Sequence, residues 1–80
     1  MDNKEYFLLG YWNDPYRPYK EYFWMRGFDS KAEALQTGKR KQEKGQPKQF
    51  IDWVKGANRV FDSEEKFLVA AKKAGLNPAL

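Results

Sequence analysis

The sequence predicts an α+β fold, an antiparallel sheet of three to four strands with two helices packed on one face. Strand-forming aromatic segments come in pairs, and each pair precedes a segment with helical periodicity. The tripeptide Phe-Asp-Ser stands at both strand-to-helix junctions, at 28–30 and at 61–63. A length of 80 residues suits one small domain, 1–80.

The first pair of strands is expected at Glu5–Trp12 and Glu21–Phe28, both rich in aromatic and large apolar residues. Between them, Asn-Asp-Pro initiates a turn, and a second proline stiffens the loop. The pattern therefore predicts a hairpin with a long, semi-rigid tip. The tip displays Tyr16, Arg17 and Tyr19.

The first helix is expected at Lys31–Glu43, ending near Gly45. Ser30 and Glu33 form a capping box, in which the hydroxyl accepts from an otherwise unpaired N–H and the carboxylate reaches back.

The remaining elements are a strand at Gln49–Val54, a turn at Lys55–Asn58, a short strand at Arg59–Phe61, a helix at Glu64–Ala74 ended by Gly75, and a flexible tail at 76–80. The cap of this second helix is either Asp62 with Glu65 or Ser63. The repeated Phe-Asp-Ser has two explanations. Either a ββα unit is duplicated, or a good strand-to-helix junction arose twice.

Catalytic chemistry is poorly represented. The chain has no histidine and no cysteine, so it lacks the commonest general base and metal ligand as well as the thiol nucleophile. Its only serines, Ser30 and Ser63, are explained as helix caps, and no glycine-rich phosphate loop is present. We therefore expect a non-enzymatic protein with no metal and no cofactor.

The same composition indicates a compartment. Absence of cysteine fits a reducing environment. No apolar run approaches the roughly 20 residues that span a bilayer, and the first residues do not resemble a signal peptide. We expect a cytoplasmic protein with no membrane partner.

Aromatic residues are concentrated at the start, where the first 28 positions hold ten of the fourteen. Strand alternation assigns Phe7, Leu9, Phe23 and Met25 to a hydrocarbon core face. The predicted partner-binding set is the opposite face together with the hairpin tip: Tyr6, Trp12, Tyr16, Arg17, Tyr19, Tyr22, Trp24 and Arg26. The alternative is that a dimer mate or the C-terminal tail covers this second face.

A basic ridge is expected on and after the first helix, at Lys39, Arg40, Lys41, Lys44 and Lys48. It suits phosphate binding, and the alternative is a solvated helix end that keeps the protein soluble. The aromatic segment 1–28 carries no net charge, so aromatic and basic residues occupy different parts of the chain.

These features favour a non-catalytic protein-binding module, a small inhibitor or adaptor that docks through the aromatic hairpin. By analogy, small phage proteins that block host machinery are of this size and have no catalytic motifs. The basic ridge points to a partner that handles nucleic acid. The alternatives are direct nucleic-acid binding by the aromatic face and the ridge, and a homodimer with a structural role.

Overall fold

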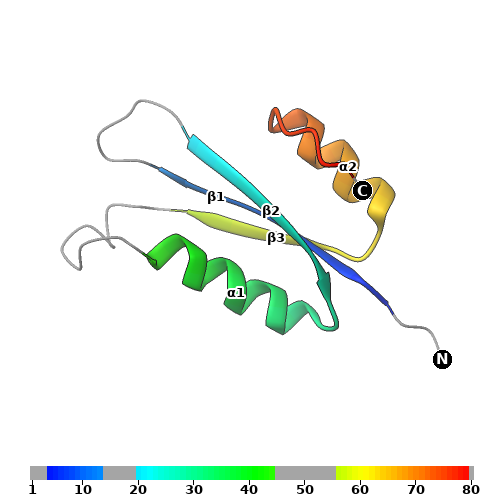
Figure 1. Ribbon diagram of the computed structural model, residues 1–80, viewed down its shortest axis with the longest axis horizontal. Coiled ribbons are helices and arrows are strands. Elements are labelled where there is room, and N and C mark those ends of the chain that lie inside the picture. Colours follow the sequence, from blue (N-terminus) through cyan, green and yellow to red (C-terminus); the bar gives the residue numbers. More distant parts are fainter. Residues whose placement is uncertain (1–3, 14–19, 45–55, 80) are drawn as a thin grey trace.

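The computed structural model describes residues 4–13, 20–44 and 56–79. Its elements are β1 (Tyr6–Asn13), β2 (Lys20–Phe28), α1 (Lys31–Glu43), β3 (Ala57–Phe61) and α2 (Glu64–Lys73) (Figure 1). The predicted α+β class, with an antiparallel three-stranded sheet and two helices, is confirmed. The predicted strand at Gln49–Val54 lies outside the described residues.

The sheet has the order β2-β1-β3, with both outer strands antiparallel to β1. Consequently β2 and β3 run parallel to each other, and the segment that contains α1 carries the chain across β1. Leu9 is a reference point for the register, because it lies opposite Trp24 on β2 and opposite Arg59 on β3.

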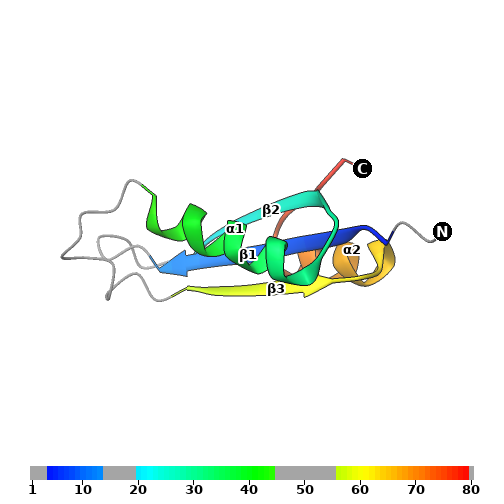
Figure 2. The same ribbon diagram turned by 90° about the horizontal axis from the view of Figure 1, so that it is seen from below.

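The two helices cover opposite faces of the sheet, so the prediction that both pack on one face is wrong (Figure 2). Ala34 of α1 packs in a buried cluster with Leu8, whereas Phe67 of α2 packs in another with Phe7 and Leu9. The cause lies in β1. As the central strand it places apolar side chains on both faces, and each face needs its own cover.

A bulge in β2 changes which residues share a face. The register shifts between Tyr6 and Leu8, which oppose Phe28 and Met25 respectively, so β2 holds one extra residue there. Gly27 supplies the backbone conformation for it, with a φ of 87° that L side chains rarely adopt. The bulge brings Phe28 into the buried cluster beneath α1.

Both helices begin at the predicted serine caps. The Ser30 hydroxyl accepts from the Glu33 N–H at 3.1 Å, and the Ser63 hydroxyl accepts from the Lys66 N–H at 3.4 Å. None of the helices in the described part of the chain is long and apolar enough to cross a membrane.

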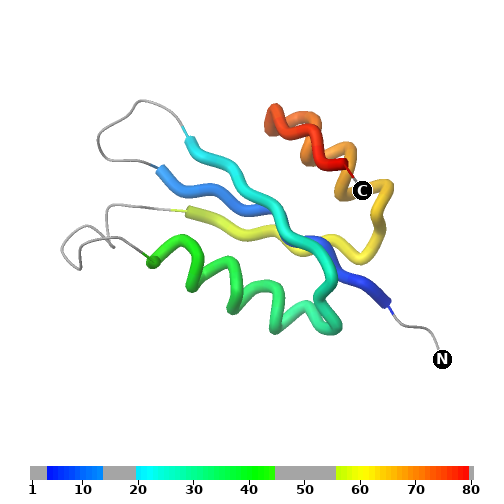
Figure 3. The backbone as a smooth tube through the Cα atoms, viewed as in Figure 1, coloured from blue at the N-terminus to red at the C-terminus, as the bar shows by residue number. Residues whose placement is uncertain are grey.

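The chain turns sharply after α2 (Figure 3). Gly75 has a φ of 82°, and the Leu76 N–H donates to the Ala71 carbonyl at 2.9 Å. Leu76 packs against the cluster around Phe67, so the segment expected as a flexible tail begins with a residue that helps to cover the core.

Candidate binding groove

The register of the hairpin divides the predicted binding face. Between Asn13 and Leu8, each pair joins an odd-numbered residue of β1 to an even-numbered residue of β2 or the reverse. Tyr22 therefore lies on the face of Tyr11, whereas Trp12 lies on the opposite face. The interpretation that placed even-numbered residues of both strands on one surface is wrong, because the faces were matched by chemistry and not by register.

Tyr6 and Trp12 belong to the α1 side of the sheet. Both pack against the buried cluster that contains Leu8 and Phe23. The rings of Trp12 and Phe23 have centroids 5.4 Å apart. These two predicted site residues therefore help to cover a core, and Tyr16, Arg17 and Tyr19 lie outside the described residues.

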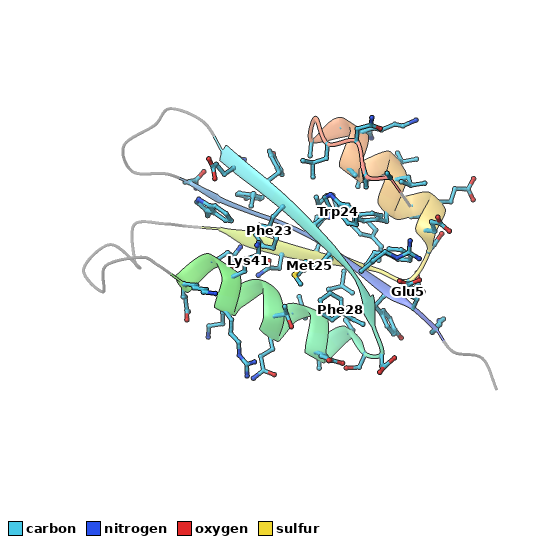
Figure 4. All side chains as sticks on the ribbon, viewed as in Figure 1. Glu5, Phe23, Trp24, Met25, Phe28 and Lys41 are labelled. Carbon is cyan, nitrogen blue, oxygen red and sulfur yellow. The ribbon has the colours of Figure 1, made fainter. Side chains whose placement is uncertain are left out.

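Trp24 lies on the α2 side and has partners there (Figure 4). Arg26 lies on the same side, beside Phe7. Trp24 packs against Phe67 with ring centroids 5.9 Å apart. Arg26 donates two hydrogen bonds of 2.8 Å to the Glu5 carboxylate and lies 5.4 Å from the centre of the Phe7 ring. Both side chains thus have structural roles in this fold.

Hydrogen bonding by Arg26 holds the pKa of Glu5 below its ordinary value, and the same pair raises the pKa of Arg26. The pair joins the segment before β1 to the bulge in β2. Its electrostatic contribution is modest, because the side chains of Arg26 and Glu5 are 40% and 33% exposed.

A concavity lies between α2 and the sheet. A hollow of about 510 Å³ adjoins a second of about 190 Å³, and we call the two together the α2 groove. They share Arg59, Ala70 and Lys73. The larger hollow is completed by Phe61, Glu65, Lys66 and Val69, and the smaller by Leu9, Tyr11, Tyr22 and Ala74.

Strand pairing explains how β3 contributes to this groove. Arg59 and Phe61 oppose Leu9 and Phe7, so they point to the face that α2 covers. On α2, Lys66, Val69, Ala70 and Lys73 follow the i, i+3, i+4, i+7 spacing of one helix side. The groove is therefore built on regular elements.

The groove ends at a pair of tyrosines. The rings of Tyr11 and Tyr22 have centroids 5.5 Å apart with an interplanar angle of 52°. The Lys20 ammonium lies 4.5 Å from the centre of the Tyr11 ring. Tyr22 remains 36% exposed, and among the described members of the predicted set it is the one that lines the groove.

Positive charge is in excess along the groove. Arg59, Lys66 and Lys73 line it, against one acid, Glu65. Arg59 lies 5.0 Å from the centre of the Phe61 ring. Within residues 4–13, 20–44 and 56–79, none of the three cations has an acidic side chain within ion-pair distance. Their charge is therefore not neutralised by those residues.

The predicted basic ridge occupies the other side of the molecule. Lys39, Arg40, Lys41 and Lys44 are exposed on α1 or at its C-terminal cap, and the Lys41 ammonium lies 5.6 Å from the centre of the Phe23 ring. Lys48 lies outside the described residues. The ridge thus lies across the sheet from the α2 groove.

Sequence reasoning missed Arg59, Lys66, Val69 and Lys73. A signal for the three helical residues was present, because their spacing places them beside the apolar stripe of α2. Arg59 could not be identified from a local pattern, because its position beside the tyrosines depends on the pairing of β3 with β1. In the part of the chain that the structure describes, no three acidic side chains gather as a metal site would require.

Comparison of the chain with protein-family models, with curated proteins and with solved structures finds no match.

Proposed function

We propose that this protein is a non-catalytic binding module that docks onto another protein through the α2 groove. One observation carries the proposal. An exposed tyrosine, an apolar floor and cations without an acidic partner among the described residues lie along one groove that is formed by three strands and a helix.

The composition of the groove matches that of protein interfaces. Tyrosine and arginine are enriched among the residues that dominate binding energy, and here Tyr11, Tyr22 and Arg59 lie around the smaller hollow. Packing of the central strand on both faces holds these side chains on a supported surface. A preformed site loses less conformational entropy on binding, which favours affinity from a small contact area.

A compact module of this kind acts by occupying a surface of its partner. We therefore propose an inhibitor or adaptor role. A partner that handles nucleic acid is consistent with the second basic surface on α1, which carries Lys39, Arg40 and Lys44. This surface lies on the opposite side from the groove and is free to make a further electrostatic contact.

Direct binding of single-stranded nucleic acid is the second candidate, and one observation favours it. Lys20, Arg59 and Lys73 lie near two tyrosines, so cations from three elements accompany the aromatic rings although the aromatic segment itself is neutral. Stacked bases and backbone-binding cations are the usual components of such sites.

The geometry of the rings favours a protein partner over a nucleic acid. Bases stack on open ring faces, but the Tyr11 ring has Lys20 against it and touches the tilted ring of Tyr22. Farther along, the groove is lined by Phe61, Val69 and Ala70, which suit apolar side chains better than phosphates.

The test compares two substitutions of similarly exposed residues on opposite faces. Tyr22 and Leu35 are 36% and 38% exposed. The wild type, Tyr22→Ala and Leu35→Ala, each confirmed as folded by circular dichroism, are used as baits with nuclease-treated extract. We expect a protein that the wild type and Leu35→Ala retain and Tyr22→Ala loses. Equal retention of that protein by all three baits would contradict docking through the groove.

A titration with single-stranded DNA and RNA tests the second candidate. If the groove binds a protein, Tyr22→Ala should not weaken the binding of either nucleic acid. Salt-sensitive binding of a labelled strand, measured by anisotropy and weakened by this variant, would instead favour the nucleic-acid function.

A further inference from the structure

We infer that the α2 groove accepts an acidic amphipathic segment of the partner, with apolar side chains against Phe61 and Val69 and carboxylates against Arg59, Lys66 and Lys73. This inference rests on the proposed function, and it specifies the chemistry of the partner.

Positive charge predominates among the residues that line the groove. Arg59 and Lys73 line both hollows, so a bound segment that runs along the groove passes both cations. Lys66 adds a third at the larger hollow, where Glu65 is the only acid among the lining residues. A segment with several carboxylates is complementary to this pattern, whereas a basic segment would meet like charges.

An apolar surface lies between the cations of the groove. Val69 is 54% exposed, although it stands on the helix that covers this face of the sheet. Phe61 is half-buried beside it, and Ala70 is a small residue that keeps the floor open. Carboxylates alone would leave this surface uncovered, so the complementary segment also carries apolar side chains.

The groove is short. Its lining residues on α2 and at the C-terminal cap of this helix run from Glu65 to Ala74. At a rise of about 1.5 Å per residue this distance is about 14 Å. An extended segment spans it with about four residues, at about 3.3 Å each. The groove therefore matches a short linear motif, in which two apolar and two or three acidic residues suffice.

The test uses four fluorescent probes and measures anisotropy. The first is a short peptide in which Glu alternates with Leu and Phe. The second replaces each Glu by Lys, the third replaces Leu and Phe by Ser, and the fourth is oligo-dT. The protein is the full chain, either as wild type, as Arg59→Glu/Lys73→Glu, or as Lys39→Glu/Lys44→Glu. The last variant makes the same change in net charge on α1, where both lysines are exposed.

We expect the Glu–Leu–Phe peptide to bind the wild type more tightly than the other three probes. The groove variant should weaken it about tenfold or more, and the α1 variant about twofold or less. If the groove variant is unfolded by circular dichroism, Arg59→Gln/Lys73→Gln replaces it, with Lys39→Gln/Lys44→Gln as its control.

The remaining outcomes overturn the inference in distinguishable ways. Preferred binding of the Lys peptide that still depends on Tyr22 would reject an acidic segment and leave the proposed function standing. Equal binding of the Glu–Ser peptide would reject the apolar contact. Groove-dependent binding of oligo-dT alone would reject both the inference and the proposed function. If no probe binds, the acidic segment is rejected, and the proposed function then depends on the Tyr22→Ala comparison.

Discussion

On the α1 face the helix approaches the sheet through small residues and amides, whereas on the α2 face it rests on aromatic rings. Beneath α1, Ala34 and Gly38 are buried, and Gln42 hydrogen-bonds to the strands. Beneath α2, Phe67 stacks on Phe7 with ring centroids 5.1 Å apart. The α2 groove lies on the face where the large ring of Phe67, and not a glycine, brings the helix against the sheet.

The amides on the α1 face form a connected network. Gln42 Nε2 donates to the Tyr11 carbonyl at 2.8 Å and to the Ala57 carbonyl at 3.2 Å, and Asn58 Nδ2 donates to Gln42 Oε1 at 3.0 Å. Asn58 Oδ1 is buried without a hydrogen-bond donor among the described residues. Such a network fixes the position of α1 along the sheet, so this face specifies structure while the other leaves a surface open.

The largest expected effect is on the α2 face. Phe67 is fully buried and contacts the rings of Phe7, Trp24 and Phe61. Phe67→Ala should lower the free energy of unfolding by about 3–5 kcal/mol, measured by urea unfolding. Val69→Ala, at an exposed position on the same helix, should change it by about 0.5 kcal/mol or less. Similar losses in the two variants would mean that α2 is not anchored by this ring.

Gly38→Ala tests the close approach of α1. In an exposed helix the change from glycine to alanine stabilises by about 1 kcal/mol. Here a β-carbon would collide with the Asn58 side chain. We expect the free energy of unfolding to fall by about 1–3 kcal/mol, as for other overpacked positions. A gain in stability would show that α1 does not pack closely on the sheet, and the contrast between the two faces would then be lost.

The smallest effect is expected at the Glu5–Arg26 pair. The pKa of Glu5 is lower in the folded state than in the unfolded state. The ionised carboxylate therefore contributes stability above its unfolded-state pKa, and this contribution is lost as the pH falls through the lowered folded-state pKa. The urea midpoint of wild type should therefore exceed that of Glu5→Gln at neutral pH and converge with it in acid. A difference that is the same at both pH values would show that the pair does not act through its charge.

Local features were predictable from the sequence, and features set by pairing were not. The cap at Ser30 was predicted correctly, and Ser63 was one of two caps predicted for the second helix, because capping depends on residues three positions apart. The faces of the hairpin were predicted wrongly, because they depend on which residues of the two strands pair and on the bulge at Gly27. One residue of difference in register exchanges the two faces of a strand.

The candidate site shows the same limit. Tyr22 was proposed as a site residue from the aromatic excess of the hairpin and from strand alternation. Arg59 and Lys73 join it because β3 pairs with β1 and α2 crosses the same face. Neither contact follows from a local pattern, so the cations beside the tyrosines are not those of the predicted ridge.

The most direct test of the central claim is a ¹H–¹⁵N chemical-shift titration of the full chain with its captured partner. If the α2 groove is the docking surface, the largest chemical-shift changes should fall on the amides of Tyr22, Arg59, Lys66 and Lys73, and the changes at Lys39–Lys44 should be smaller. Shifts confined to α1, with the groove residues unchanged, would contradict the account and transfer the site to the opposite face of the sheet.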